Sequence, residues 1–398
     1  MIQNFDYQTP TRVIFGKGVI GQLPAVMKPL GRRVLLAYGG GSIKRIGLYG
    51  KVKELLKDFE ITELSGIEPN PKYDPSVLEG VRLCKENDID VILSVGGGSV
   101  LDCCKAISTG AKYDGEPWDL IIGKVKATDA VPIVDIMTLA ATGSEYDAGG
   151  VISRTETNDK VAYHDELLFP VCSFLDPTYT FSVNAKHTAA GVADAINHVF
   201  EQYFCSDHNM VADGFCVTLL RTLMHYAPIA IAHPDDYEAR AEIMYACMYG
   251  CNGILALGNS MSGWPMHAIE HALSAYYDIT HGEGLAIITP RWMRHILSER
   301  TMERFVSLGV NLYGIDRTLP DREIAEQTIE RTYRFFESIG LPMHLREVGI
   351  DESRLREMAV HAKEKDLSAG EQYVDLSADE QYVDLSADDI TAILNDSL

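Results

Sequence analysis

The segment DVILSVGGGSVLD, residues 90–102, joins a short apolar run through three consecutive glycines to what reads as the start of a helix. Glycines allow another group to approach the backbone closely, and the free amides at a helix N-terminus favour a bound anion. The segment therefore predicts a strand–turn–helix corner that holds a pyrophosphate, although a purely structural corner would use similar residues. The candidate cofactor contacts in it are Gly97, Gly98, Ser99 and Asp102.

The alternation of β-rich runs with helical stretches extends on both sides of this corner, over residues 1–180. Such a rhythm predicts a Rossmann-like α/β domain, with a mainly parallel sheet, helices on both faces and ligands at the carboxyl ends of the strands. We place this dinucleotide-binding domain at residues 1–184. The expected strands are 11–15, 33–38, 60–64, 90–95, 132–138 and 172–176.

Beyond residue 185 the pattern changes to long helical segments with few β-like runs between them. We therefore predict an all-helical second domain at residues 185–398. The expected helices are 186–204, 209–226, 235–253, 260–277, 284–297, 300–313, 320–339 and 351–364.

A second glycine-rich segment, LLAYGGGSIKR at residues 35–45, follows the second expected strand. A site that selects NAD usually places an acidic residue here, to bind the ribose 2′-hydroxyl. None lies between Tyr38 and Arg45, whereas Lys44 and Arg45 bring positive charge, so we predict NADP(H) rather than NAD(H). A basic helix start on the surface is the alternative. The predicted contacts are Gly39, Gly40 and Ser42.

A third segment, TLAATGSEYDAGGVI at residues 138–152, is rich in threonine, glycine and serine and again follows a strand. We predict that Thr138 and Thr142 bond cofactor oxygens. Lys160, a little further on, is a candidate to neutralise phosphate, although its spacing alone is that of any exposed lysine.

Asp194 and His198 are four residues apart in one expected helix, and His267 and His271 repeat that spacing in another. Four residues turn a helix by about 400°, so each pair shares one face. His281 follows in the segment THGEG, whose glycines we expect to bend the backbone sharply. A carboxylate with several imidazoles suits a divalent transition metal such as Zn²⁺ or Fe²⁺, and Mn²⁺ or Co²⁺ would also fit.

The composition limits the classes of partner that the protein is expected to bind. A net charge of −22 argues against the phosphate backbone of nucleic acids and against anionic membranes. No leader peptide is apparent and no run approaches the length of a membrane span, so we expect a cytoplasmic protein that binds no membrane. Eight cysteines without a CxxC pair predict buried, reduced thiols.

The nine residues EQYVDLSAD occur at 371–379 and again at 380–388. Nine residues turn a helix by about 900°, so this insertion within a helix would turn its apolar face to water. We therefore expect the duplication in a surface loop and assign it no function. Ser386 with Asp389 resembles a capping box that starts a final helix.

These segments resemble, in order and over nearly the whole chain, the iron-containing (group III) alcohol dehydrogenases, in particular their NADPH-dependent butanol dehydrogenase and aldehyde reductase branch. The matching stretches are 10–18, 38–44, 68–71, 95–107, 139–145, 191–204, 267–287 and 383–390. Tyr146 and Asp147 depart from this pattern, since many relatives have methionine and asparagine there.

The resemblance implies hydride transfer between NADP(H) and a small primary alcohol or aldehyde, such as butanol or butanal, in a homodimer that contains iron or zinc. It implies Asp194, His198, His267 and His281 as metal ligands. His271 then matches a histidine outside the ligand set, and we consider it a candidate proton shuttle or a packing residue. The alternatives are a metal- and dinucleotide-dependent lyase of the dehydroquinate synthase type, an ATP-dependent kinase and a non-catalytic metal-binding protein.

Overall fold

The computed structural model describes residues 2–205, 209–259, 263–369 and 385–398, with the side chains of 365–369 excepted. The chain forms two compact units. The α/β unit comprises Gln8–Val183 and His233–Asn252, and the helical unit comprises Met1–Tyr7, Asn184–Ala232 and Gly253–Leu398.

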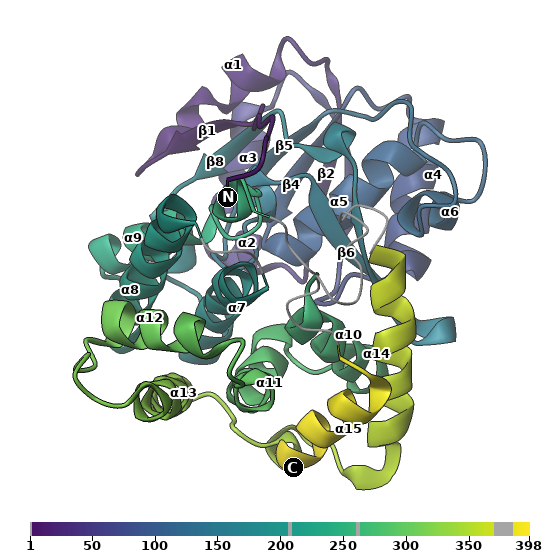
Figure 1. Cartoon of the computed structure of the whole chain (residues 1–398). Helices are drawn as coiled ribbons and strands as arrows, with labels where there is room; N and C mark the ends of the chain where they lie inside the picture. The colour runs from purple at the N-terminus through teal and green to yellow at the C-terminus, as the bar shows by residue number, and fades with distance from the viewer. Residues whose placement is uncertain (1, 206–208, 260–262, 370–384) are drawn as a thin grey trace. The chain divides into compact units, whose positions relative to one another are not determined.

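The α/β unit contains a six-stranded sheet, whose strands are β1 Arg12–Phe15, β2 Arg33–Tyr38, β3 Glu60–Ser65, β4 Val91–Gly96, β5 Ile133–Met137 and β8 Cys172–Leu175. All six expected strands are confirmed, with ends shifted by at most one residue. The strand order is β1-β8-β5-β4-β2-β3, and every neighbouring pair is parallel (Figure 1).

Helices cover both faces of this sheet, because side chains alternate between the two faces along each buried strand. On one face, Leu35 and Ile92 belong to a core shared with α4 (Leu78–Glu86) and α5 (Gly98–Gly110). On the other face, Val34, Leu36 and Leu93 share a core with α1 (Leu23–Met27) and α3 (Leu48–Leu55).

A two-stranded antiparallel hairpin follows β5 in the chain and was not predicted. It consists of β6 (Gly149–Arg154) and β7 (Asp159–His164). Its turn places Asn158 in the left-handed region, with φ at 52°. Short alternating runs with an asparagine turn are the usual signal of a hairpin, so the sequence contained this information.

The two units differ from the predicted domains in two places. Helix α9 (Tyr237–Cys247), expected among the helices of the second domain, belongs to the α/β unit. Its Met244, with Met248 just beyond it, enters the apolar core on one face of the sheet. The N-terminal residues, in turn, belong to the helical unit, where the amide of Gln3 donates to the carbonyl of Gly258 at 2.9 Å.

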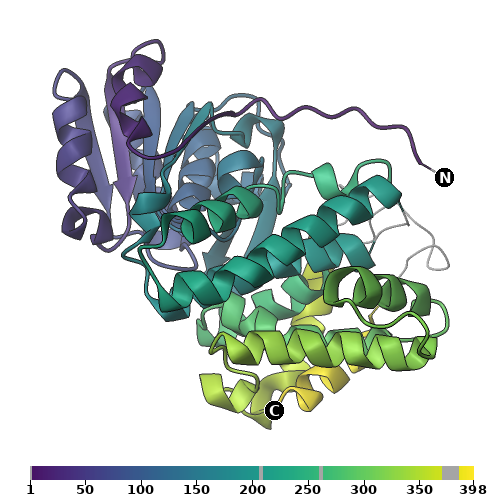
Figure 2. The same ribbon diagram turned by 90° about the vertical axis from the view of Figure 1, so that its left-hand side faces the viewer.

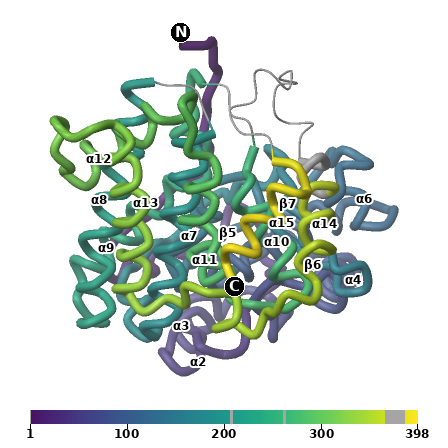
Figure 3. Tube along the Cα trace, turned by 60° about the horizontal axis from the view of Figure 1, so that its bottom comes forward, coloured from purple at the N-terminus to yellow at the C-terminus, as the bar shows by residue number. Residues whose placement is uncertain are grey.

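The helical unit consists mainly of α-helices. Its first long helix is capped by Asn184, whose side chain accepts a hydrogen bond from the amide of His187 at 2.9 Å. The helix bounds are α7 Ala185–Phe204, α8 Met210–Ala232, α10 Pro265–Tyr277, α11 His281–Ile296, α12 Met302–Tyr313, α13 Asp321–Ser338, α14 Leu355–Ala369 and α15 Ala387–Asp396. Helices α12 and α13 pack side by side (Figure 2), and α14 packs against both α10 and α15 (Figure 3).

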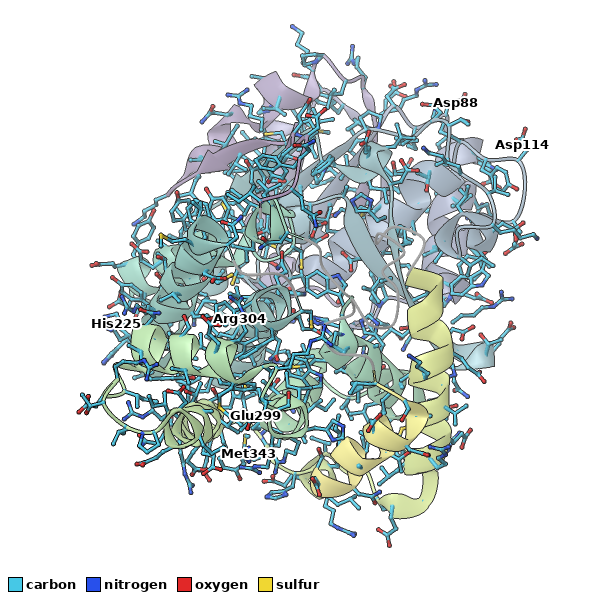
Figure 4. The ribbon with its side chains drawn as sticks, viewed as in Figure 1. Asp88, Asp114, His225, Glu299, Arg304 and Met343 are labelled. Carbon is cyan, nitrogen blue, oxygen red and sulfur yellow. The ribbon has the colours of Figure 1, made fainter. Side chains whose placement is uncertain are left out.

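By length and composition, α8 could cross a membrane, contrary to the sequence-based expectation, with 23 residues and a mean hydropathy of 1.4 over its most apolar window. Core helices of globular proteins meet the same criterion. Cys216, Leu220 and Leu223 of α8 are buried, and Asp213 forms an ion pair with Arg304 of the same unit at 2.7 Å (Figure 4 labels Arg304).

The predicted capping box at the C-terminus is confirmed. The amide of Asp389 donates to the Ser386 hydroxyl at 3.2 Å, and the amide of Ser386 donates to the Asp389 carboxylate at 2.9 Å. Most of the duplicated nine-residue segment lies outside the described residues. The thiols are free, and all except that of the half-buried Cys251 are buried, as expected.

Candidate functional site

Three helices of the helical unit bring the four predicted metal ligands together. Asp194 and His198 come from α7, His267 from α10, and His281 from the first turn of α11. The Oδ1 atom of Asp194 lies 3.6 Å from Nε2 of His198, 3.6 Å from Nε2 of His267 and 3.5 Å from Nε2 of His281. One carboxylate oxygen therefore faces three imidazole nitrogens.

The glycines that follow His281 do not bend the chain, so that prediction is wrong. Gly282 and Gly284 lie inside α11, where they permit close helix packing. A Cβ atom on Gly282 would lie 1.9 Å from the carbonyl oxygen of Ala190 on α7, and one on Gly284 would lie 2.8 Å from Cγ of Glu270. Their small size lets α11 approach α7 and α10 closely enough to present His281.

Two buried glutamates that the sequence analysis missed orient the imidazoles. Glu201, on α7, faces Nδ1 of His267 and also accepts a hydrogen bond from the His267 amide at 3.0 Å. Glu270, on α10, faces Nδ1 of His281. Both glutamates are fully buried. A carboxylate at Nδ1 favours the tautomer whose Nε2 lone pair points away, here toward Asp194.

A signal for these carboxylates was present in the sequence. Each glutamate lies three residues after a histidine, as His198 with Glu201 and His267 with Glu270. The spacing places each glutamate near the face of its own helix that carries the histidine. It does not predict the observed pairing, in which Glu201 contacts Nδ1 of His267 on another helix and Glu270 contacts Nδ1 of His281 on a third.

The charges in this cluster are strongly coupled. Burial acts to raise the pKa of Asp194, but the imidazoles of His198, His281 and His267 outweigh it and hold that pKa well below its usual range. Burial acts to lower the pKa of His267, but Glu201 and Asp194 outweigh it and raise that pKa to about 10. The cluster therefore attracts positive charge, which a proton or a metal cation can supply.

The residues fit a divalent transition metal. Oδ1 of Asp194 and Nε2 of His267 are buried and have no hydrogen-bond partner among the described residues. Ligand atoms of Asp194, His267 and His281 all lie within 4.8 Å of one another. Together with His198 they form a set of three nitrogens and one oxygen, which suits Zn²⁺ or Fe²⁺.

His271 lies beside this cluster, one turn after His267 on α10. Its ring centroid is 5.5 Å from that of His281 and 6.0 Å from that of His267. It is half-buried, and one ring nitrogen lies within 4.8 Å of ligand atoms of Glu270 and His281. Tertiary structure thus separates His271 from His267, which spacing alone could not do.

We expect Glu201→Gln to weaken metal binding about 10- to 100-fold, the usual effect of losing a carboxylate behind a metal-binding histidine. A glutamine can present an amide N–H to Nδ1, which would shift the imidazole proton to Nε2, where the metal has to bind. Equilibrium dialysis with Co²⁺ would measure the change. A variant that binds metal as tightly as the wild type would show that Glu201 does not orient His267.

In the α/β unit, the glycine-rich corner between β4 and α5 forms as predicted. A Cβ atom on Gly96 would lie 2.4 Å from the side chain of Val100, and one on Gly98 would lie 2.5 Å from Thr142. The amide of Thr138 donates to the carbonyl of Gly96 at 2.8 Å. The structure therefore brings two predicted cofactor contacts, Thr138 and Thr142, to the same corner as Gly97, Gly98 and Ser99.

Asp102 binds the segment that follows Thr142. Its carboxylate accepts hydrogen bonds from the Ser144 hydroxyl at 2.7 Å and the Val151 amide at 3.0 Å. Burial raises the pKa of Asp102 to about 6, against the lowering effects of Lys105 and Ser144. Asp102 thus has a clear structural role, and its predicted contact with the cofactor stays a prediction.

One helical turn further along α5, the ammonium group of Lys105 is fully buried in a cage of oxygen atoms. It donates to the carbonyls of Ser144 at 2.8 Å, Asp147 at 3.1 Å and Gly149 at 2.6 Å, and to the Asp147 carboxylate at 2.8 Å. This explains Asp147, which sequence comparison marked as a departure from many relatives. Its carboxylate neutralises Lys105.

The second glycine-rich loop connects β2 to the short helix α2 (Ser42–Arg45) and includes Gly39, Gly40 and Ser42. Lys44 lies 4.9 Å from the ring centres of both Tyr38 and Tyr49. Glu63, an acid on the neighbouring strand β3, accepts hydrogen bonds from the Tyr38 and Tyr49 hydroxyls, each at 2.8 Å. Glu63 lies outside the stretch from Tyr38 to Arg45, in which the sequence has no acid.

Lys160, the remaining predicted cofactor residue, lies on β7, where its backbone pairs with Ser153 of β6. It is largely buried rather than an ordinary exposed lysine.

Two further buried acids predict a pH dependence for the stability of this protein. Burial raises the pKa of Asp135, in the central strand β5, to about 7 and that of Glu145 to about 8. The folded state therefore retains protons that the unfolded state has already lost, so stability should fall as the pH rises from about 5 to 8.

Glu145→Gln should remove part of this dependence, because glutamine resembles the protonated acid. We expect the stability difference between variant and wild type to change by on the order of 1 kcal/mol per pH unit in this window. Chemical denaturation at several pH values would measure it. If the free energies of unfolding of variant and wild type run parallel as the pH changes, Glu145 does not bind a proton on folding.

Comparisons with known proteins agree with this architecture. Residues 10–177 match the family model for iron-containing alcohol dehydrogenase, and residues 188–398 match the model for the C-terminal part of the Fe-containing alcohol dehydrogenase family. The chain belongs to the iron-containing alcohol dehydrogenase family. This assignment favours a dehydrogenase over the lyase and kinase alternatives.

Named relatives in this family differ in cofactor. NADH-dependent butanol dehydrogenase A of Clostridium acetobutylicum is 48% identical to the chain, over 90% of this chain and 92% of that protein. The NADPH-dependent aldehyde reductase YqhD of Escherichia coli is 37% identical, over 89% and 91%. The crystal structure of NADH-dependent butanol dehydrogenase A from Thermotoga maritima matches with a TM-score of 0.94 and 34% identity, covering 100% of this chain and 99% of that one.

Proposed function

We propose that this alcohol dehydrogenase catalyses reversible hydride transfer between NADP(H) and a small primary alcohol or aldehyde, such as butanol or butanal, with Fe²⁺ or Zn²⁺ bound. The observation that carries the proposal is the convergence of Asp194 with three imidazoles, two of them backed by buried glutamates. The names of the butanol dehydrogenase and aldehyde reductase relatives support the substrate class.

Asp194, His198, His267 and His281 would hold a divalent cation, which would supply Lewis-acid polarisation of a carbonyl, and a bound dinucleotide would supply the hydride. The chain supplies the arrangement around them. Glu201 and Glu270 keep the proton of each imidazole on Nδ1, so that Nε2 of His267 and His281 stays available. Asp194 contributes the negative charge that balances the cation.

His271 is our candidate for proton transfer, because it lies beside His281 and an imidazole can both donate and accept a proton. In the direction of aldehyde reduction, it would give a proton to the substrate oxygen, and in the reverse direction it would take that proton back. His271→Gln should lower kcat and alter the pH profile while leaving the metal content unchanged. An unchanged profile would assign His271 to packing alone.

The preference for NADP(H) rests on the loop after β2. No acid is present between Tyr38 and Arg45, and Lys44 and Arg45 are positively charged. Glu63, the acid bound to Tyr38, also forms an ion pair with Lys53 at 3.0 Å, which balances its charge. NADH dependence is the alternative, and the names of the relatives from Clostridium acetobutylicum favour it.

The decisive experiment compares kcat/KM for NADPH and NADH with butanal as substrate, using metal-loaded protein. We expect NADPH to be preferred. Lys44→Ala should reduce that preference about tenfold or more, since a hydrogen bond to a charged group contributes about 1.5–3 kcal/mol. A preference for NADH in the wild type would overturn the assignment of the cofactor but not that of the reaction. Absence of butanal reduction with either nucleotide would overturn the reaction itself.

A further inference from the structure

Trp264 precedes α10 and lies against the candidate metal cluster. The rings of His198 and His267 stack on each other with centroids 4.5 Å apart and planes 12° apart. The Trp264 ring meets both nearly at right angles, with its centroid 5.9 Å from that of His198 and 5.6 Å from that of His267. One aromatic side chain therefore contacts two of the four predicted ligands.

The cluster is not equally open on all sides. Glu201 and Glu270, which face Nδ1 of two imidazoles, are completely buried, so the side they occupy is closed to a substrate. Trp264, His271 and His281, in contrast, are only half-buried. Among the described residues, these partly exposed groups leave one side of the cluster accessible to a molecule from solvent, and Trp264 is the large apolar one among them.

We infer that Trp264 is a specificity-determining residue, whose indole forms the apolar surface against which the alkyl chain of the substrate packs. This inference rests on the proposed function and deepens it. The buried carboxylates offer no surface to a hydrocarbon, and His271 and His281 present polar rings. An indole beside the ligands therefore favours an aliphatic aldehyde over one with a charged or strongly hydrated tail.

The position of Trp264 can be tested without turnover, because Co²⁺ quenches the fluorescence of a nearby indole. The chain has three tryptophans. Titrating metal-free protein with Co²⁺ should quench a component of the emission that is lost in Trp264→Phe. The matched control is Trp118→Phe, since Trp118 packs against Tyr73 in the α/β unit, with ring centroids 5.1 Å apart, and belongs to a different core.

In this control the quenching should persist. Quenching that also persists in Trp264→Phe would overturn the inference, because the indole would then not lie beside the bound metal. Absence of any quenching in the wild type, with Co²⁺ binding verified by dialysis, would overturn it equally.

The role of Trp264 in specificity is tested by comparing propanal, butanal and pentanal. Each methylene buried against the indole should raise kcat/KM about fourfold in the wild type. We expect this gradient to be nearly lost in Trp264→Ala and reduced in Trp264→Phe, mainly through KM, with metal content unchanged. If the alanine variant does not fold, the comparison between Trp264→Phe and the wild type is the test.

The inference would be overturned if a folded, metal-loaded Trp264 variant showed the same rise of kcat/KM from propanal to pentanal as the wild type. If the wild type reduces none of these aldehydes, the proposed function fails, and so does the assigned role in specificity. The Co²⁺ titration would still report whether Trp264 lies beside the metal.

Discussion

Replacing Asp194 with alanine is expected to abolish tight metal binding and to lower kcat/KM for aldehyde reduction by about a thousandfold or more, since a metal used as a Lewis acid provides several kcal/mol of transition-state stabilisation. The cause is specific to this site. Oδ1 of Asp194 faces Nε2 of all three predicted histidine ligands at 3.5–3.6 Å. Its loss would leave three imidazoles without the anion that balances a cation.

The measurement is metal content after dialysis together with steady-state kinetics. His225→Ala is a suitable control, since His225 is an exposed histidine on α8 of the same unit (labelled in Figure 4). It should retain both metal and activity. A folded Asp194→Ala protein with full metal content, or a metal-free wild type with full activity, would refute the assigned role of Asp194.

The second large effect concerns stability. Lys105→Met should lower the free energy of unfolding by about 3–5 kcal/mol, because it leaves the buried carboxylate of Asp147 without its charged partner. The three carbonyl oxygens that Lys105 also binds would lose a hydrogen-bond donor. Chemical denaturation of the whole chain would measure the loss.

Adding Asp147→Asn to the Lys105→Met protein should recover part of this stability, because the uncompensated charge is then removed. Lys51→Met is the matched control, since Lys51 is exposed and pairs with the exposed Glu54 of the same helix. It should change stability little. A Lys105→Met protein as stable as the wild type would show that the oxygen cage does not require the ammonium group.

Periodicity and spacing predicted the elements of this protein well. The six strands of the parallel sheet and most of the helices could be placed because each has a strong local pattern of apolar residues. The β6–β7 hairpin was missed, although its strands are as long as those of the sheet and Asn158 marks its turn. Helix α9 was predicted as a helix but placed in the other domain, because its amphipathic pattern does not show which core Met244 enters.

The same distinction applies to the candidate site. The sequence by itself determined that Asp194 and His198 share a helix face, that His267 and His271 do so on another helix, and that glycines form the corner after β4, because these are consequences of helix geometry and of glycine's size. Only the tertiary structure decided that His267 faces Asp194 while His271 lies to one side. It also decided that Glu201 orients a histidine on another helix, and that Gly282 serves close packing rather than a bend. Such choices depend on how helices distant in sequence pack together, and no local pattern of residues encodes that packing.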